Sequence, residues 1–139
     1  MLFTVMQVIP TTKFIAGLHS MPLPVIQGFD YSDTNGGLAK SQTVSLPAGT
    51  VEGDIVIAIF VSELASNNVN LSCDDVNFTK IGQAGTATAG VYIGAWWYRA
   101  TATPPADVTM RQESAFNYSN QGWTLRVSGC VDTGDPIED

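Results

Sequence analysis

Charged side chains are scarce in this chain of 139 residues, and basic ones are the scarcest. Charged residues make up 14% of the sequence, against roughly 25% in an average soluble domain. Lys and Arg together number 6, they are scattered along the chain, and the formal net charge is -7. A protein that binds nucleic acid needs clustered basic residues to neutralise phosphates. The composition therefore argues against a nucleic-acid partner.

Long apolar runs, histidine and cysteine are also scarce. No stretch approaches the roughly 18 consecutive apolar residues of a membrane-spanning helix, so we expect a soluble protein with no membrane partner. The chain has one histidine, His19, and two cysteines, Cys73 and Cys130, which do not have the spacing of zinc ligands. A disulfide between the cysteines would close a long loop, but the first residues lack the basic segment of a secretory signal. We therefore expect two free, partly buried thiols.

Catalytic motifs are missing from the sequence as well. It contains no Gly-x-Ser-x-Gly elbow and no Walker loop, and neighbouring carboxylates at Asp74 and Asp75 would diverge on an extended chain instead of flanking a glycosidic bond. Two acidic loops could offer oxygens to calcium, but neither has EF-hand spacing. We predict that the protein is not an enzyme and has no cofactor. The two loops contain Asp74, Asp75 and Asn77, and Asp132, Asp135, Glu138 and Asp139.

Short apolar runs separated by 13 Gly and 7 Pro residues dominate what is present. Residues 55–61, IVIAIFV, form a continuous apolar run that is typical of a strand buried on both faces or at the centre of a sandwich. Residues 122–128, GWTLRVS, alternate with period two, so one of the two faces of this strand should lie on the core. The pattern predicts one all-β domain, an antiparallel β-sandwich. Further strands are expected at 42–46, 69–73, 78–81, 90–100 and 107–112.

Aromatic residues gather in the run 90–100, GVYIGAWWYRA. Alternation places Tyr92, Trp96 and Tyr98 on one face and Trp97 on the other, so the two adjacent tryptophans cannot enter the same core. One of them must meet a second layer, a neighbouring molecule or solvent. The plainer interpretation is that loops or N-terminal residues cover both rings, since large aromatics are usually buried. Trp96 and Trp97 are the candidate contacts for a partner or a glycan.

The first forty residues differ in texture from the rest. They contain the apolar runs MLFTVMQVIP and TTKFIAGLHS, a Pro-broken stretch, and an Asn-Gly-Gly turn signal at 35–37. This pattern predicts either an ordinary edge strand of the same domain or an extended arm that inserts into a neighbour's groove or sheet edge. Phe3 and Phe14 are the candidate contacts of this arm. We divide the chain into an N-terminal arm or edge segment, 1–40, and a sandwich domain, 41–139.

Three segments carry a family resemblance: SLPAGTVEGDIVIAIFV at 45–61, NFTKIGQAGTATAGVYIGAWWYRAT at 77–101 and SGCVDTGDPIED at 128–139. Together they resemble the jelly-roll-like β-sandwich of tailed-bacteriophage structural proteins. The shared features are a Pro-Ala-Gly turn, Gly-Asp before an apolar strand, an aromatic strand with Tyr-Arg, and a closing Gly-Val-Asp-Thr with Pro-Ile. The chain departs from this pattern by inserting Cys130 in the closing motif and by having Phe78 where a tryptophan is frequent.

The resemblance implies a non-enzymatic virion protein, either a capsid decoration or cement subunit or the anchoring domain of a head or tail fibre. It implies major capsid, tail or fibre proteins as partners, and a homo-oligomer, with a trimer as one arrangement. Related chains continue with further strands, which implies that this chain is part of a longer product or receives a strand from a neighbour. The alternative function is a carbohydrate-binding, lectin-like sandwich. Its candidate sugar contacts are Trp96, Trp97, Trp123 and Asn117.

Overall fold

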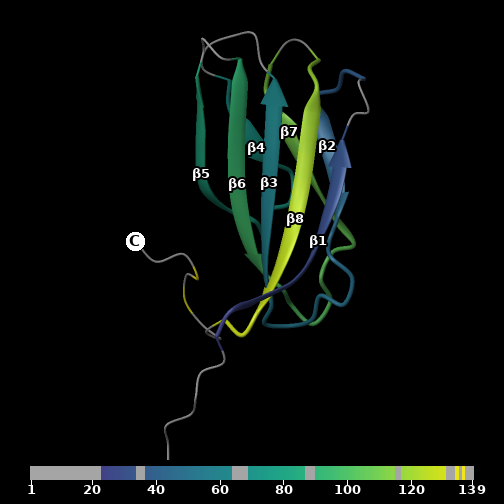
Figure 1. Cartoon of the computed structure of the whole chain (residues 1–139), viewed down its shortest axis with the longest axis vertical. Helices are drawn as coiled ribbons and strands as arrows, with labels where there is room; N and C mark the ends of the chain where they lie inside the picture. The colour runs from purple at the N-terminus through teal and green to yellow at the C-terminus, as the bar shows by residue number, and fades with distance from the viewer. Residues whose placement is uncertain are drawn as a thin grey trace, which may run out of the picture.

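Antiparallel strands in two layers make up the fold, which is seen in a computed structural model (Figure 1). The predicted contacts Phe3 and Phe14 and the acidic residues Asp132 and Asp135 lie outside the residues that the structure describes. The described residues are 23–33, 37–63, 69–86, 90–114, 117–130, 134 and 136. Among them, no helix is long and apolar enough to cross a lipid bilayer.

The larger sheet has the strand order β1-β8-β3-β6-β5, and the smaller sheet has the order β2-β7-β4. In Figure 1 the larger sheet is the layer nearest the viewer, with the smaller sheet behind it. The pairs β1 with β8, β2 with β7 and β3 with β6 are three of the four pairs of a jelly roll, whereas β5 pairs with β6 instead of β4, so the arrangement is jelly-roll-like. The predicted fold class is confirmed. The strands are β1 (Val25–Asp33), β2 (Ser41–Ser45), β3 (Ile55–Glu63), β4 (Leu71–Cys73), β5 (Thr79–Thr86), β6 (Val91–Arg99), β7 (Asp107–Gln112) and β8 (Asn120–Ser128).

Strand β5 is the element whose extent was predicted least well, since it continues past the expected 78–81 to Thr86. Gly82 and Gly85 lower the strand propensity of this stretch, but pairing with β6 overrides it. A side chain at Gly85 would collide with the ring of Tyr92, the residue opposite it on β6. The glycine that weakens the sequence signal is thus the residue that lets the aromatic ring lie over the strand.

Both edge strands of the larger sheet have an irregular register. On β1 the pairing shifts between Ile26 and Gly28, and on β5 it shifts between Lys80 and Gly82. The prediction for residues 1–40 included an edge strand, and residues 25–33 of that segment form one, β1. The edges are therefore bulged, while the central strands β8, β3 and β6 pair without interruption.

The core lies between the two sheets, and most of its apolar residues come from alternate positions of β2, β3, β4, β6 and β7. On β3, Val56, Ala58 and Phe60 point inward and are fully buried, whereas Ile57 and Ile59 point outward and are only half-buried. The prediction that residues 55–61 are buried on both faces is therefore wrong for the single chain, whereas the alternative prediction, a strand at the centre of the sandwich, is confirmed, because β3 is the middle strand of the larger sheet. The buried cluster also includes Val44, Leu46, Val69, Leu71, Phe78, Tyr92, Trp96, Tyr98, Ala100, Val108 and Met110.

Strand β8 turns its polar side toward the core. Thr124 is fully buried, and its Oγ1 donates a hydrogen bond to the carbonyl oxygen of Ser45 at 2.6 Å. Gly122 also faces inward, where a Cβ atom would lie 2.6 Å from Cγ2 of Val44. The close approach of the two sheets thus selects small residues on the inner face of β8. The large apolar residues of this strand, Trp123 and Leu125, are left on the outer face.

A buried ion pair links the loop between β2 and β3 to strand β8. It is formed by Asp54 in the loop and Arg126 on β8. Asp54 is 5% exposed, and its Oδ2 accepts hydrogen bonds from Nε of Arg126 at 2.6 Å and from the backbone N–H of Val51 at 3.0 Å. The guanidinium of Arg126 also donates to the carbonyl oxygen of Ala48 at 3.3 Å. Removing the arginine would leave the Asp54 carboxylate buried without its cation.

We predict that Arg126→Ala lowers the free energy of unfolding by about 3 kcal/mol, because a buried charge loses its partner. Urea denaturation followed by circular dichroism measures this loss. The control is Arg111→Ala, which breaks the ion pair with Asp74, in which the two side chains are 48% and 40% exposed. We expect this control to cost less than about 1 kcal/mol. Equal losses in the two variants would contradict the structural role of the Asp54–Arg126 pair.

Candidate functional site

The outer face of the larger sheet is the candidate site, because apolar side chains continue across it from strand to strand. Residues directly opposite one another on paired strands share a face of the sheet. Two cross-strand rows on this face are apolar over four strands, and we call them the apolar face. The first row is Phe29, Leu125, Ile57 and Trp97, and the second is Tyr31, Trp123, Ile59 and Ala95.

Much of the apolar face is open to solvent in the single chain. Phe29 is 74% exposed and Ile26, beside it on β1, is 65% exposed. The central residues Ile57, Ile59 and Trp97 are half-buried. In Figure 1 no described segment lies over the middle of this sheet. Contiguous apolar patches larger than a few hundred Å² are rare on monomeric proteins and mark interaction sites.

Charged residues occur only at the two ends of the outer face of the central strands β3 and β6. Arg99, at the end of β6, is opposite Ile55 on β3. Glu63, at the other end of β3, is opposite Val91 at the start of β6. The antiparallel register therefore gives the face a basic end and an acidic end with apolar rows between them.

Two hydrogen bonds lie at the ends of the outer face. Nη2 of Arg99 donates to the carbonyl oxygen of Gly134 at 3.2 Å. At the acidic end, Oη of Tyr31 donates to Oδ2 of Asp33 at 2.5 Å. This hydrogen bond, with smaller contributions from desolvation and from the Asp33 charge, raises the pKa of Tyr31 above its ordinary value.

The two tryptophans that were predicted as contacts, Trp96 and Trp97, lie on opposite faces of the larger sheet. Trp96 is 3% exposed and lies in the core, with Nζ of Lys80 at 5.8 Å from its ring, so its indole is not accessible to a partner. Trp97 lies on the apolar face. Trp123 is on the same face, where its ring is 5.4 Å from that of Tyr31 and tilted by 37°. Asn117 is exposed in the segment before β8.

The surroundings of Trp97 and Trp123 suit a protein partner better than a sugar. A sugar site combines ring stacking with several hydrogen bonds. The cross-strand neighbours of Trp97 are Ile57 and Thr79, so one hydroxyl is the polar group next to it. Trp123 lies between Ile59 and Tyr31. Apolar neighbours of this kind are typical of the core of a protein interface.

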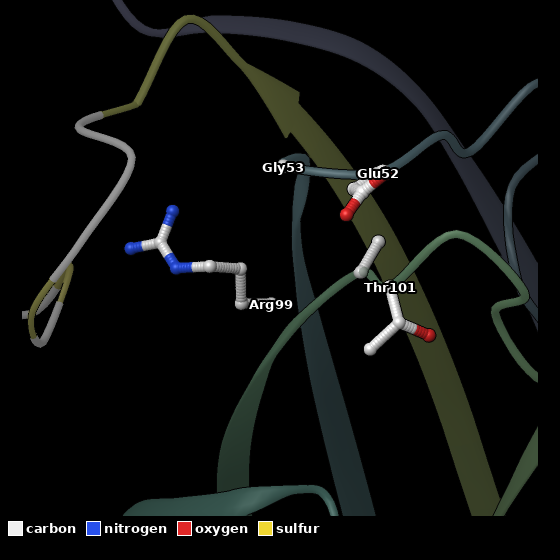
Figure 2. A pocket seen from close by; sticks show the side chains of 5 residues that line it. Glu52, Gly53, Arg99 and Thr101 are labelled. Atoms are coloured by element: carbon white, nitrogen blue, oxygen red, sulfur yellow. The ribbon is translucent and has the colours of Figure 1, made fainter.

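A pocket of about 430 Å³ lies at the basic end of the larger sheet. It is lined by Glu52, Gly53, Arg99, Ala100 and Thr101. Figure 2 shows the guanidinium of Arg99 on one side and the Glu52 carboxylate on the other. The Thr101 hydroxyl is 3.1 Å from Oη of Tyr98. The lining contains one cation and one anion, but no histidine or cysteine that could serve as base or nucleophile.

The described acidic loop makes its contacts within the chain. Asp74 forms an ion pair with Arg111, and Oδ1 of Asp75 accepts hydrogen bonds at 2.9 Å from both the backbone N–H and Nδ2 of Asn77. This is the local side-chain-to-backbone bond of an Asx turn. In the part of the chain that the structure describes, no group of three or more His, Cys, Asp or Glu residues is placed to hold a metal ion.

No family model, curated protein or solved structure matches the chain. The resemblance to the sandwich of tailed-bacteriophage structural proteins stays a prediction from the sequence motifs. The functional argument therefore depends on the apolar face itself.

The two cysteines are free and partly buried, as predicted. Burial is the main cause that raises the pKa of Cys73 from 9.0 to about 11, and the carboxylates of Asp75 and Asp74 add to it, while a backbone hydrogen bond at Asp75 acts in the opposite direction. The thiolate is the reactive form of cysteine. Cys73 should therefore react slowly near neutral pH.

We predict that iodoacetamide labels Cys73 at pH 8 roughly a hundredfold more slowly in the folded protein than in urea, since the thiolate fraction falls tenfold per unit of pKa. The measurement uses Cys130→Ser, which leaves Cys73 as the single thiol, and mass spectrometry. The folded-state rate should still be rising above pH 10. A rate that levels off near pH 9 would contradict the raised pKa of Cys73.

Proposed function

We propose that the protein is a non-enzymatic structural subunit that is built into a larger assembly by protein–protein contacts at its apolar face. The observation that carries this proposal is the pair of uninterrupted apolar rows across β1, β8, β3 and β6. A surface of this kind is unfavourable in water and is stabilised by burial against another apolar surface.

The size of the face fits such a role. Strands about 4.8 Å apart and about 30 Å long give a five-stranded sheet a flat area of roughly 700 Å². At about 25 cal/mol per Å² of apolar surface removed from water, burying even half of this area would favour association by several kcal/mol. The estimate supports a permanent neighbour over a brief encounter.

The virion is the assembly that we propose, as a capsid decoration or cement subunit or as the anchoring domain of a fibre. Two arguments support it: the sequence motifs that resemble tailed-bacteriophage sandwiches, and the jelly-roll-like topology, since jelly rolls are found in viral capsid proteins. The topology is a fold-level analogy, because one fold serves many functions. Its partners would be major capsid, tail or fibre proteins.

The lectin-like alternative receives less support from the site. Jelly rolls also occur among lectins, but Trp96 is in the core and the neighbours of Trp97 and Trp123 are largely apolar. Binding of the isolated protein to a glycan array, lost in a folded Trp97→Ala variant, would favour the lectin over the structural subunit.

We predict that the protein co-purifies with virions from a culture that produces it, and that Ile57→Lys lowers its incorporation at least tenfold, because a charge is then buried at the centre of the contact. Quantitative mass spectrometry of gradient-purified particles measures the incorporation. Val76→Lys is the matched control, since Val76 is 96% exposed and lies in the loop between β4 and β5, outside the two apolar rows.

Circular dichroism must show that both variants fold before their incorporation is compared. Absence of the wild-type protein from the particles would overturn the proposed virion role. Equal incorporation of Ile57→Lys and Val76→Lys would overturn the role of the apolar face.

A further inference from the structure

We propose that the apolar face binds a second copy of this chain, with the two larger sheets packed face to face and their strands antiparallel across a two-fold axis. This inference rests on the proposed function, which requires that the face be buried, and it names the molecule that buries it. Closed two-fold dimers are the commonest symmetric assemblies, and each copy uses the same surface patch in them.

The whole outer face of the larger sheet, of which the apolar face is a part, is large enough for such a dimer. A stable interface buries about 800 Å² of accessible surface on each partner. The flat area of the sheet is roughly 700 Å². Its accessible surface area is larger, because the side chains of Phe29, Trp97 and Trp123 lie on it. Sheets that pack face to face lie about 10 Å apart with interdigitated side chains. The second copy would supply the layer that β3 lacks on its outer side.

The shape of the rows fits a two-fold axis through their middle. Nine residues of β3 pair with nine of β6, and the central pair is Ile59 with Ala95. Small Ala95 lies on this central row between Ile59 and β5, and it leaves room beside Trp97 on the neighbouring row. A two-fold axis perpendicular to the strands and midway between the two apolar rows would place Trp97 of one copy over Ala95 of the other, and Ile57 over Ile59.

The charges at the two ends of the outer face favour one orientation of the second copy, in which its strands run antiparallel to those of the first. The axis perpendicular to the strands brings Arg99 of one copy over Ile93 of the other, diagonal to Glu63 on the neighbouring strand β3, and symmetry forms this contact twice. A two-fold axis parallel to the strands would place Arg99 against Arg99 and Glu63 against Glu63. Like charges at an interface are unfavourable. The antiparallel arrangement is therefore the one that pairs opposite charges.

Analytical ultracentrifugation of the full chain over the micromolar range tests the proposal. We expect a monomer–dimer equilibrium, and we expect Ile57→Lys to weaken it at least roughly a hundredfold, since it places a charge at the centre of the interface. Val76→Lys should dimerise as the wild type does. Circular dichroism shows that each variant folds.

Charge reversal tests the orientation. Arg99→Glu and Glu63→Arg should each weaken the dimer roughly tenfold, and the double variant should restore it, because the two sites exchange charges across the interface. If Arg99→Glu and Glu63→Arg each leave the dimer unchanged, as expected when like residues face one another and each reversal replaces one like-charge pair with another, the strands run parallel across the interface and the proposed arrangement is overturned. A trimer, or a dimer that Ile57→Lys leaves unchanged, also overturns it.

A monomer at every concentration would overturn the dimer, and a dye then separates this failure from failure of the proposed function. Binding of the apolar probe bis-ANS to wild-type monomer, lost in Ile57→Lys and kept in Val76→Lys, would show an open face that serves a different protein. A monomer that binds no dye would mean that the face is covered within the chain itself. That result would overturn the dimer and the proposed function together.

Discussion

Strand β3 is apolar on both faces, while the described part of the chain covers only one of them. Its inner residues Val56, Ala58 and Phe60 are sealed by the smaller sheet. Of its outer residues, Ile55 is buried, whereas Ile57 and Ile59 in the middle of the strand are only half-buried. Removal of apolar surface from water lowers the free energy. Covering the outer face with a third layer would therefore be favourable. The candidate site, the proposed assembly and the proposed dimer all follow from this requirement.

The strands were largely predictable from the sequence, because turn residues and apolar runs are local signals. Strand β7 begins and ends where the run 107–112 predicts, and β3 begins at Ile55 as expected. The length of β5 was not predictable, since its glycines argue against a strand until the ring of Tyr92 is known to lie over Gly85. The sequence also did not predict that the polar side of β8 faces the core. The reason is the close approach of Val44 to Gly122, which are far apart in the sequence.

The candidate site was predictable only in part. Alternation placed Trp96 and Trp97 on opposite faces, but it could not tell which face would be the interior. The run 55–61 contained the decisive signal, because a run that is apolar at every position has two faces to bury. The roles of Phe29 and Tyr31 could not be predicted, since their place beside Leu125 and Trp123 depends on the pairing of β1 with β8. The separation of Arg99 from Glu63 likewise arises only when β3 and β6 run antiparallel.

The register irregularities on β1 and β5 affect whether further chains can add to the edges of the larger sheet. A straight, unpaired strand at the border of a sheet is a template for further chains, and repeated addition there leads to fibrils. Kinks at Ile26 to Gly28 and at Lys80 to Gly82 interrupt the ladder at both borders, and Lys80 adds a positive charge, which disfavours such stacking. The irregular edges thus disfavour the addition of further strands beside β1 and β5. The flat outer face, in contrast, can bind only one further layer. In the proposed assembly, these irregular edges favour a complex of finite size.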